Sequence, residues 1–175
     1  DSSPGFISCN RGKRSISLDL KVDEGKDILR KLITTAGVFA QNFRPGAIER
    51  LGFGEPEVRD IKSDIVYLSI SGVGETGPYV GKRVYDPVVQ ALSGLADIQA
   101  DPITGRPRMV RTLVADKTTA IYAAQAVTAA LFHRAMTGEG QHVRLSMLDT
   151  MVSFLWPEGM SNYTVKADGD KTPVT

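Results

Sequence analysis

Short apolar runs rich in β-branched and aromatic residues alternate along this chain with longer stretches of helical spacing. Such runs are typical of strands, whereas apolar residues at intervals of three and four indicate helices. Strands that alternate with helices predict a parallel sheet, because parallel neighbours need long crossover connections. We therefore expect an α/β fold, a Rossmann-like open and mainly parallel sheet with helices on both faces, whose ligands bind beyond the carboxyl ends of the strands.

The individual elements follow from the same patterns. Strands are predicted at residues 15–20, 38–40, 65–70, 109–114 and 143–147. Helices are predicted at residues 23–37, 45–52, 55–62, 86–95, 117–135 and 150–155. The strongest of these predictions is the helix 117–135, which is dense in alanine and is followed by Gly138 as a stop.

The composition of the 175 residues narrows the classes of function. Basic and acidic residues nearly cancel, 21 against 20, so the overall field favours neither nucleic acid nor an anionic membrane as a partner. No apolar run reaches the length of a membrane span. A single cysteine, Cys9, excludes an internal disulfide and fits a reducing compartment, so we expect one cytoplasmic domain over residues 1–175.

Asp116 lies directly before the predicted helix 117–135. A carboxylate at that place usually caps the helix by accepting backbone N–H bonds, which contribute about 1 kcal/mol. The same geometry would keep the carboxylate ionised at the end of a connection in an α/β fold, as a nucleophile requires. The sequence alone favours the cap, and the two interpretations are compatible.

The glycine-rich segment 71–78 (SGVGETGP) would allow backbone N–H groups to approach an anion. Its spacing matches neither GxxxxGK[ST] nor GxGxxG, so a structural turn is the preferred interpretation. His133 and His142 have no nucleophile motif beside them and are expected to be structural. The acidic residues show no metal-ligand spacing, so no metal site is predicted.

Five segments carry a resemblance to a known family. They are residues 10–21 (NRGKRSISLDLK), 41–52 (QNFRPGAIERLG), 69–79 (SISGVGETGPY), 85–94 (YDPVVQALSG) and 137–149 (TGEGQHVRLSMLD). In order and spacing they resemble the class III CoA-transferases, the group of formyl-CoA transferase, L-carnitine CoA-transferase and α-methylacyl-CoA racemase. The likeness spans nearly the whole chain. It corresponds to the N-terminal part of that family's large CoA-binding domain, without the family's opening unit and C-terminal portions.

The resemblance implies a CoA site and a catalytic group. The CoA-binding residues would be Leu18, Lys21, Asn42, Phe43, Arg50, Arg83, Tyr85 and Met147. From residue type alone, Tyr85 is more readily interpreted as a core residue at a helix start. Asp116 would be the catalytic carboxylate, forming first an anhydride with an acyl group and then an aspartyl-CoA thioester.

Three hypotheses of function stay open. The leading one is CoA transfer between an acyl-CoA and a carboxylic acid by a homodimer, with CoA as a substrate and no permanently bound cofactor. The first alternative is a non-catalytic module for CoA binding or self-association. The second is an acyl-CoA racemase or epimerase, which the resemblance favours less because racemases of this group have a histidine where this chain has Tyr85.

Overall fold

The computed structural model describes residues 3–164 and is built on a parallel three-stranded sheet. Its strands, in spatial order, are β1 (Val38–Gln41), β2 (Val66–Ser71) and β3 (His142–Ser146). Because all pairings are parallel, the carboxyl ends of the strands meet at one edge of the sheet. The predicted α/β class is confirmed.

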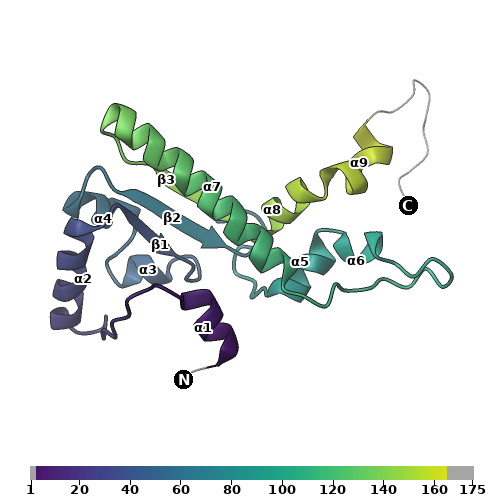
Figure 1. Ribbon diagram of the computed structural model, residues 1–175, viewed down its shortest axis with the longest axis horizontal. Helices are drawn as coiled ribbons and strands as arrows, with labels where there is room; N and C mark the ends of the chain where they lie inside the picture. Colours follow the sequence, from purple (N-terminus) through teal and green to yellow (C-terminus); the bar gives the residue numbers. More distant parts are fainter. Residues whose placement is uncertain (1–2, 165–175) are drawn as a thin grey trace.

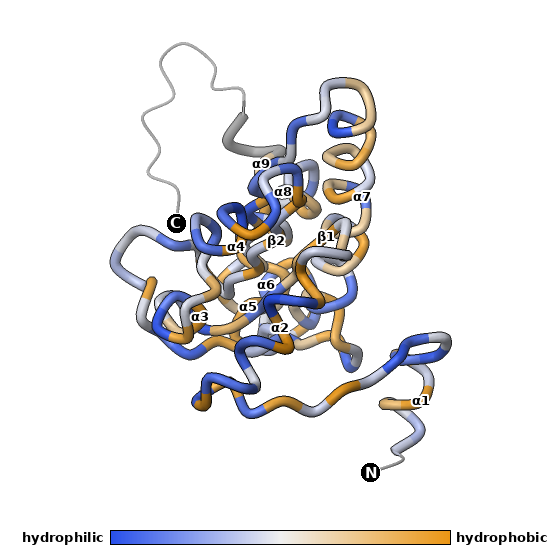
Figure 2. The backbone as a smooth tube through the Cα atoms, turned by 90° about the vertical axis from the view of Figure 1, so that its left-hand side faces the viewer, coloured by the Kyte–Doolittle hydropathy of each residue, from blue (hydrophilic) through white to orange (hydrophobic). Residues whose placement is uncertain are grey.

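Helices lie on both faces of this sheet. Along the described residues they are α1 (Pro4–Asn10), α2 (Asp23–Thr35), α3 (Ala47–Arg50), α4 (Glu55–Ile61), α5 (Asp86–Leu92), α6 (Leu95–Ile98), α7 (Val114–Thr137), α8 (Met147–Phe154) and α9 (Trp156–Thr164). In Figure 1, α7 runs in front of the sheet, where it packs against β2 and β3. Figure 2 shows α3 and α4 on the opposite side. No helix between residues 3 and 164 is both long and apolar enough to cross a membrane.

Tyr67 of β2 organises the core on the face covered by α3 and α4. Its ring belongs to a buried cluster with Ile33, Ile48, Phe53, Val58 and Ile65. Its hydroxyl donates a 2.9 Å hydrogen bond to the Phe53 carbonyl. Burial raises the pKa of Tyr67 to about 12, so the hydroxyl remains a donor at neutral pH. This one side chain therefore fastens the turn before α4 to the centre of the sheet.

A second buried cluster lies beside the carboxyl edge of the sheet and joins α5, α6, α7 and α8. Its members are Val89, Leu95, Ala115, Met151 and Leu155. Ala115 is fully buried in this cluster. The cluster therefore fixes the first turn of α7, in which Asp116 is the neighbouring residue.

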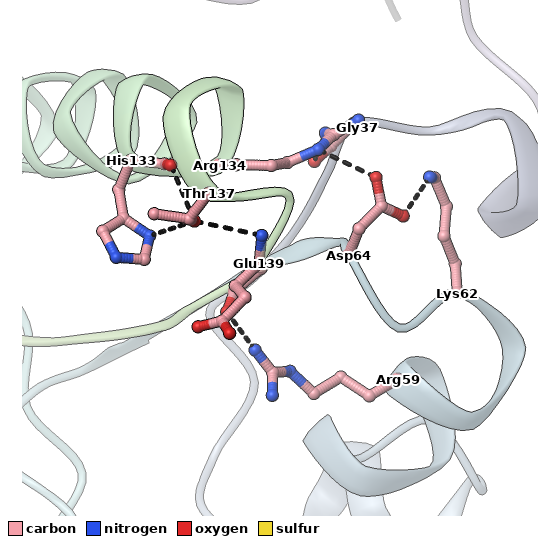
Figure 3. A network of polar contacts seen from close by, with 9 residues as sticks. Gly37, Arg59, Lys62, Asp64, His133, Arg134, Thr137 and Glu139 are labelled. Atoms are coloured by element: carbon pink, nitrogen blue, oxygen red, sulfur yellow. Dashed lines mark hydrogen bonds and ion pairs between the residues drawn. The ribbon is translucent and has the colours of Figure 1, made fainter.

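A polar network ties down the opposite, amino edge of the sheet (Figure 3). Arg134 of α7 pairs with Asp64 at 2.9 Å and donates to the Gly37 carbonyl at 3.1 Å. Lys62 also bonds to Asp64, and Arg59 of α4 donates to the carbonyl of Gly140. Since Gly37, Asp64 and Gly140 precede β1, β2 and β3, the network joins the starts of all three strands to α4 and α7.

Two predicted strands are wrong. Residues 15–20 form no strand, and Ile16, which the alternation placed on a buried face, is 60% exposed. A strand exists through pairing, and no strand of the described chain lies beside this segment. Residues 109–114 also stay outside the sheet, because Val110 bonds to the side chain of Gln90 instead of a neighbouring strand. In both segments the local pattern suited a strand but the pairing partner was missing.

Two boundaries near the site also differ from the predictions. The predicted helix 86–95 divides into α5 and α6, because Gly94 takes a left-handed backbone conformation with φ +84°. Met147, predicted at the end of the last strand, instead begins α8. The Ser146 hydroxyl caps that helix by accepting the Asp149 N–H at 3.2 Å.

Candidate active site

A cavity of about 390 Å³ opens at the carboxyl edge of the sheet. Its wall is formed by the turn after β1, the glycine-rich loop after β2, the segment before α5 and the first turn of α7. The predicted site residues on this wall are Asn42, Phe43, Arg83, Tyr85, Asp116 and Met147. The position agrees with the rule that open parallel sheets bind ligands beyond their carboxyl ends. Tyr85 is 69% exposed, so its interpretation as a core residue is wrong.

Three predicted CoA residues do not line this cavity. Leu18 and Lys21 were expected at the end of a strand that does not form, and Leu18 is half-buried while Lys21 is exposed. The backbone N–H of Lys21 donates to the Asp19 carboxylate at 2.9 Å. Arg50 lies nearer to the cavity than Leu18 and Lys21 do. Its guanidinium is 3.0 Å from the position that a Cβ on Gly46 would occupy. It therefore packs against the turn after β1, whose residues form one wall of the cavity.

Asp116 is the third residue of α7 and does not cap it. The N-cap position is held by Leu113, whose apolar side chain makes no capping bond. A carboxylate from another helix takes that role, because Oδ2 of Asp86 accepts the Asp116 N–H at 3.0 Å. The predicted capping role of Asp116 is therefore wrong, and its side chain lines the cavity instead.

The electrostatic surroundings of Asp116 also differ from the expectation. Asp116 is an exposed residue, but partial burial of its carboxyl still raises the pKa above the usual value, and the nearby charge of Asp86 raises it further. The cap geometry had predicted the opposite direction, since backbone N–H bonds would stabilise the ionised form. A carboxylate with a raised pKa is more basic once ionised, which makes it a stronger nucleophile.

Asp86 and Gln90 form a buried pair that the sequence analysis missed. They are 2% and 1% exposed. The Gln90 side-chain amide donates to Oδ1 of Asp86 at 2.5 Å, and its oxygen accepts the Val110 N–H at 2.9 Å. The two residues are four apart, which places them on one face of α5 and was the available signal. Their long-range bonds to Val110 and Asp116 have no local pattern and could not be read from spacing.

Gly72 fixes the distance between two walls of the cavity. A Cβ at this position would lie 1.8 Å from Cγ2 of Val84, so only glycine allows the segment before α5 to approach so closely. The Gly72 carbonyl also accepts the Leu148 N–H at 3.0 Å, which joins the loop to α8. The glycine-rich segment thus has a structural role in shaping the cavity, and Ser71, Gly72, Val73 and Gly74 also line it.

A second cavity of about 330 Å³ lies on the Tyr67 face of the sheet and shares Phe43, Pro45, Ile70 and Ser71 with the first. On its wall, Nε2 of His142 is 2.8 Å from the Ser69 hydroxyl. The imidazole lies edge-on to the Tyr67 ring, with 5.0 Å between the two ring centroids. Burial lowers the pKa of His142, and the charge of Arg144 lowers it further. These contacts agree with the structural role predicted for His142.

The sequence and the fold both match known proteins. The model of CoA-transferase family III matches residues 1–173. Succinate–glutarate CoA-transferase of Agrobacterium fabrum is 38% identical over 164 residues, which are 94% of this chain and 40% of that protein. Formyl-CoA:oxalate CoA-transferase of Streptomyces avermitilis is 40% identical over 142 residues, 81% of this chain and 34% of that protein.

A solved structure gives the same relation. A CAIB/BAIF family protein from Brucella suis superposes with a TM-score of 0.87 at 35% identity, covering 91% of this chain and 42% of that one. The chain thus spans about 40% of the length of the curated relative from Agrobacterium fabrum. With a match over residues 1–173 and the same fold, this chain belongs to CoA-transferase family III.

Proposed function

We propose that this chain forms the CoA-binding, nucleophile-bearing part of an acyl-CoA:carboxylate CoA-transferase. One observation carries the proposal: residues assigned to CoA by the resemblance, among them Asn42, Arg83 and Tyr85, line the same cavity as Asp116. They come from separate segments of the chain. The names of the related enzymes, which transfer CoA to or from acids such as succinate, glutarate and oxalate, support the same reaction class.

The cavity offers the two kinds of contact that a CoA thioester needs. Arg44, Lys82 and Arg83 place cations on its wall for charge-assisted bonds to phosphates. The rings of Phe43 and Tyr85 are 50% and 69% exposed and provide apolar surface for the less polar parts of the ligand. Arg50 would extend the cationic wall, and Leu18 and Lys21 remain predicted contacts. Met147 would lie near the reacting thioester, beside Asp116.

The proposed chemistry proceeds through Asp116. Its carboxylate oxygen attacks the thioester carbonyl, and the C–S bond breaks to leave an acyl–aspartyl anhydride and CoA thiolate. The thiolate then attacks the aspartyl carbonyl, releasing the donor acid and leaving an aspartyl-CoA thioester. An acceptor carboxylate attacks this thioester to give a new anhydride, and the thiolate takes up the acceptor acyl group and frees Asp116. Each step exchanges acyl groups of similar energy, which is the advantage of covalent catalysis.

The complete enzyme, in this proposal, is a cytoplasmic homodimer that takes an acyl-CoA and a carboxylic acid as substrates. The family match supports CoA as substrate. The near balance of 21 basic and 20 acidic residues supports neither a nucleic acid nor a membrane partner.

The test is trapping of the covalent intermediate. The chain is incubated with an acyl-CoA and hydroxylamine, which converts an activated aspartyl group to a hydroxamate, and the peptides are analysed by mass spectrometry. Modification is expected at Asp116, and its loss is expected in Asp116→Asn but not in the control Asp97→Asn, which lies on α6 outside the cavity wall. Calorimetry with CoA measures binding separately.

The rival functions give other results. CoA binding by a folded chain without modification of Asp116 would contradict the nucleophile and favour a non-catalytic module. Solvent deuterium at the α-carbon of the acyl group would favour a racemase instead.

A further inference from the structure

Gln90 of α5 is bonded to the segment that leads into α7. Its side chain is 1% exposed and does not line the cavity. Its Oε1 accepts the Val110 N–H at 2.9 Å, and its Nε2 donates to Oδ1 of Asp86 at 2.5 Å. Nε2 also donates to the carbonyl oxygens of Val110 and Thr112, each at 3.3 Å. One buried amide therefore joins the carboxylate at the start of α5 to the residues just before α7.

These contacts fix which way the Gln90 amide points. Its NH₂ group meets three oxygen acceptors, and its oxygen meets one N–H donor. A turned amide would set its oxygen against the Asp86 carboxylate and its NH₂ against the Val110 N–H, so the opposite orientation loses the bonds. Glutamate has the same shape but no N–H to donate, and methionine has neither a donor nor an oxygen. The site therefore requires an amide and not only a side chain of this size.

Asp86 connects the Gln90 amide to the backbone of Asp116. Both oxygens of the buried Asp86 carboxylate are bonded, because Oδ1 accepts from Gln90 and Oδ2 accepts the Asp116 N–H at 3.0 Å. Leu113 at the N-cap position supplies no side-chain bond, so Asp86 provides the cap that α7 lacks. In Figure 1, α5 lies beside the start of α7, and the two helices are in contact. A change at Gln90 is therefore transmitted to Asp116 through one carboxylate.

From these bonds we infer that Gln90 is a positioning residue for Asp116: it holds the Asp86 carboxylate in the orientation that fixes the first turn of α7, and thereby directs the Asp116 side chain into the cavity. Its effect on rate rests on the proposed function. Gln90 is not on the cavity wall, so its loss leaves the CoA contacts in place. A displaced nucleophile slows the chemical step more than it weakens binding, so acyl transfer to Asp116 falls while CoA affinity stays the same.

The first test is Gln90→Glu, which keeps the shape but sets a second carboxylate against Asp86. At saturating acyl-CoA, hydroxylamine trapping of Asp116 is expected to slow by about tenfold to a hundredfold. CoA affinity, measured by calorimetry, is expected to stay unchanged. Gln125→Glu is the control, because it adds the same charge at an exposed position of α7 outside the cavity wall. Trapping of Gln90→Glu at the wild-type rate, or a loss of CoA affinity as large as the loss of rate, overturns the inference.

A reciprocal exchange tests the bond between the two side chains. In Gln90→Glu combined with Asp86→Asn, the amide and the carboxylate change places. The new amide donates to the new carboxylate, and its oxygen accepts the Asp116 N–H, with the same net charge as in the wild type. Most of the trapping rate is expected to return, although the two 3.3 Å bonds to backbone carbonyls are not replaced. A role in packing alone predicts no recovery, so a double variant as slow as Gln90→Glu contradicts the inference.

A spectroscopic measurement separates the positioning role from the proposed function. Without any ligand, Gln90→Glu is expected to shift the amide resonance of Asp116, and the exchange is expected to return it toward its wild-type position. A wild-type chain that hydroxylamine does not trap would contradict the proposed function alone, whereas an Asp116 resonance that Gln90→Glu leaves unchanged would overturn the role of Gln90. If circular dichroism shows Gln90→Glu to be unfolded, the exchange must restore the fold, and its failure to do so also overturns the inference.

Discussion

The two edges of the sheet are built in opposite ways. At the amino edge, Arg134 holds the carboxylate of Asp64, and the pKa of Asp64 is lowered, first by its bond to Lys62. At the carboxyl edge, Asp116 faces a cavity, and burial raises its pKa. One carboxylate is therefore favoured in its charged form by the fold, while the other is charged at a cost.

The amino edge of the sheet therefore contributes stability, whereas the carboxyl edge holds the candidate reactive group. Ion pairs and backbone contacts fasten the starts of the strands, so the loops at their ends are free to expose Phe43 and Tyr85 to a ligand. A reactive carboxylate needs such surroundings, since an ion pair would lower its nucleophilicity. The comparison can be tested by placing matched changes at the two edges.

The largest expected effect is at the amino edge. A Cβ on Gly140 would lie 2.2 Å from the Ile65 carbonyl oxygen, and rigid backbone cannot move aside. Gly140→Ala is expected to lower the free energy of unfolding by about 3–4 kcal/mol. Urea denaturation measures the loss, with Gly81→Ala as the control because a Cβ there meets nothing within 4 Å. Equal stability of the two variants would show that the amino edge is not tightly packed.

The next effect concerns the carboxylate that caps α7. Asp86→Ala removes the shortest hydrogen bond of the Gln90 amide, which keeps only its 3.3 Å bonds to the carbonyls of Val110 and Thr112, and it leaves the N–H of Asp116 without its acceptor. A loss of about 2–3 kcal/mol is therefore expected in denaturation. The pKa of Asp116 is expected to fall, because burial would still raise it but the charge of Asp86 would be gone. Carbon-13 NMR titration of the Asp116 carboxyl measures that shift. An unchanged Asp116 pKa in this variant would show that the charge of Asp86 does not raise it.

At the carboxyl edge the matched glycine change is expected to cost less stability. In Gly72→Ala the new Cβ meets the side chain of Val84, which can move, so the loss is about 1–2 kcal/mol. The loss of CoA affinity, measured by calorimetry, is expected to be larger than this loss of stability, because Arg83 and Tyr85 move with Val84. Gly72→Ala combined with Val84→Ala should restore much of the affinity. A stability loss as large as that of Gly140→Ala would contradict the difference between the two edges.

The smallest expected effect is on the pH dependence of stability, to which Asp64 and Asp116 should contribute with opposite signs. The pKa of Asp64 lies below its usual value of 3.8, so its contribution to stability is present above that value and is lost as the pH falls through the lowered pKa. The pKa of Asp116 is raised, so its ionisation opposes folding once the pH rises above the usual value of 3.8.

Melting temperatures measured over a range of pH test the sign of both contributions to stability. At neutral pH, Asp64→Asn should lower the melting temperature and Asp116→Asn should raise it, and both differences should vanish at low pH. Two differences of the same sign would refute the contrast.

The sequence predicted the sheet well where local pattern and pairing agree. β2 and α7 lie close to their predicted positions, because a β-branched run and a long alanine-rich stretch each suit one structure. Residues 15–20 have a strand pattern, but whether a partner lies alongside is not a local property. The same limit explains residues 109–114, whose peptide groups bond to Gln90.

The site was predicted in part for a similar reason. Family order pointed to Asn42, Arg83 and Asp116, and the topology of a parallel sheet brings the segments that hold them to one edge. Asp86 escaped notice because its role depends on a contact across 30 positions of sequence. The direction of the Asp116 pKa followed from that same contact and from burial, neither of which spacing reveals.

Asp86 has a further consequence because it directly follows Tyr85. One peptide unit links Tyr85, whose exposed ring lies on the cavity wall, to Asp86, whose carboxylate accepts the Asp116 N–H. We therefore expect a ligand that displaces Tyr85 to change the length of that hydrogen bond even if it makes no contact with Asp116. The nitrogen-15 chemical shift of the Asp116 amide is thus expected to report ligand binding at Tyr85, even in the absence of catalysis.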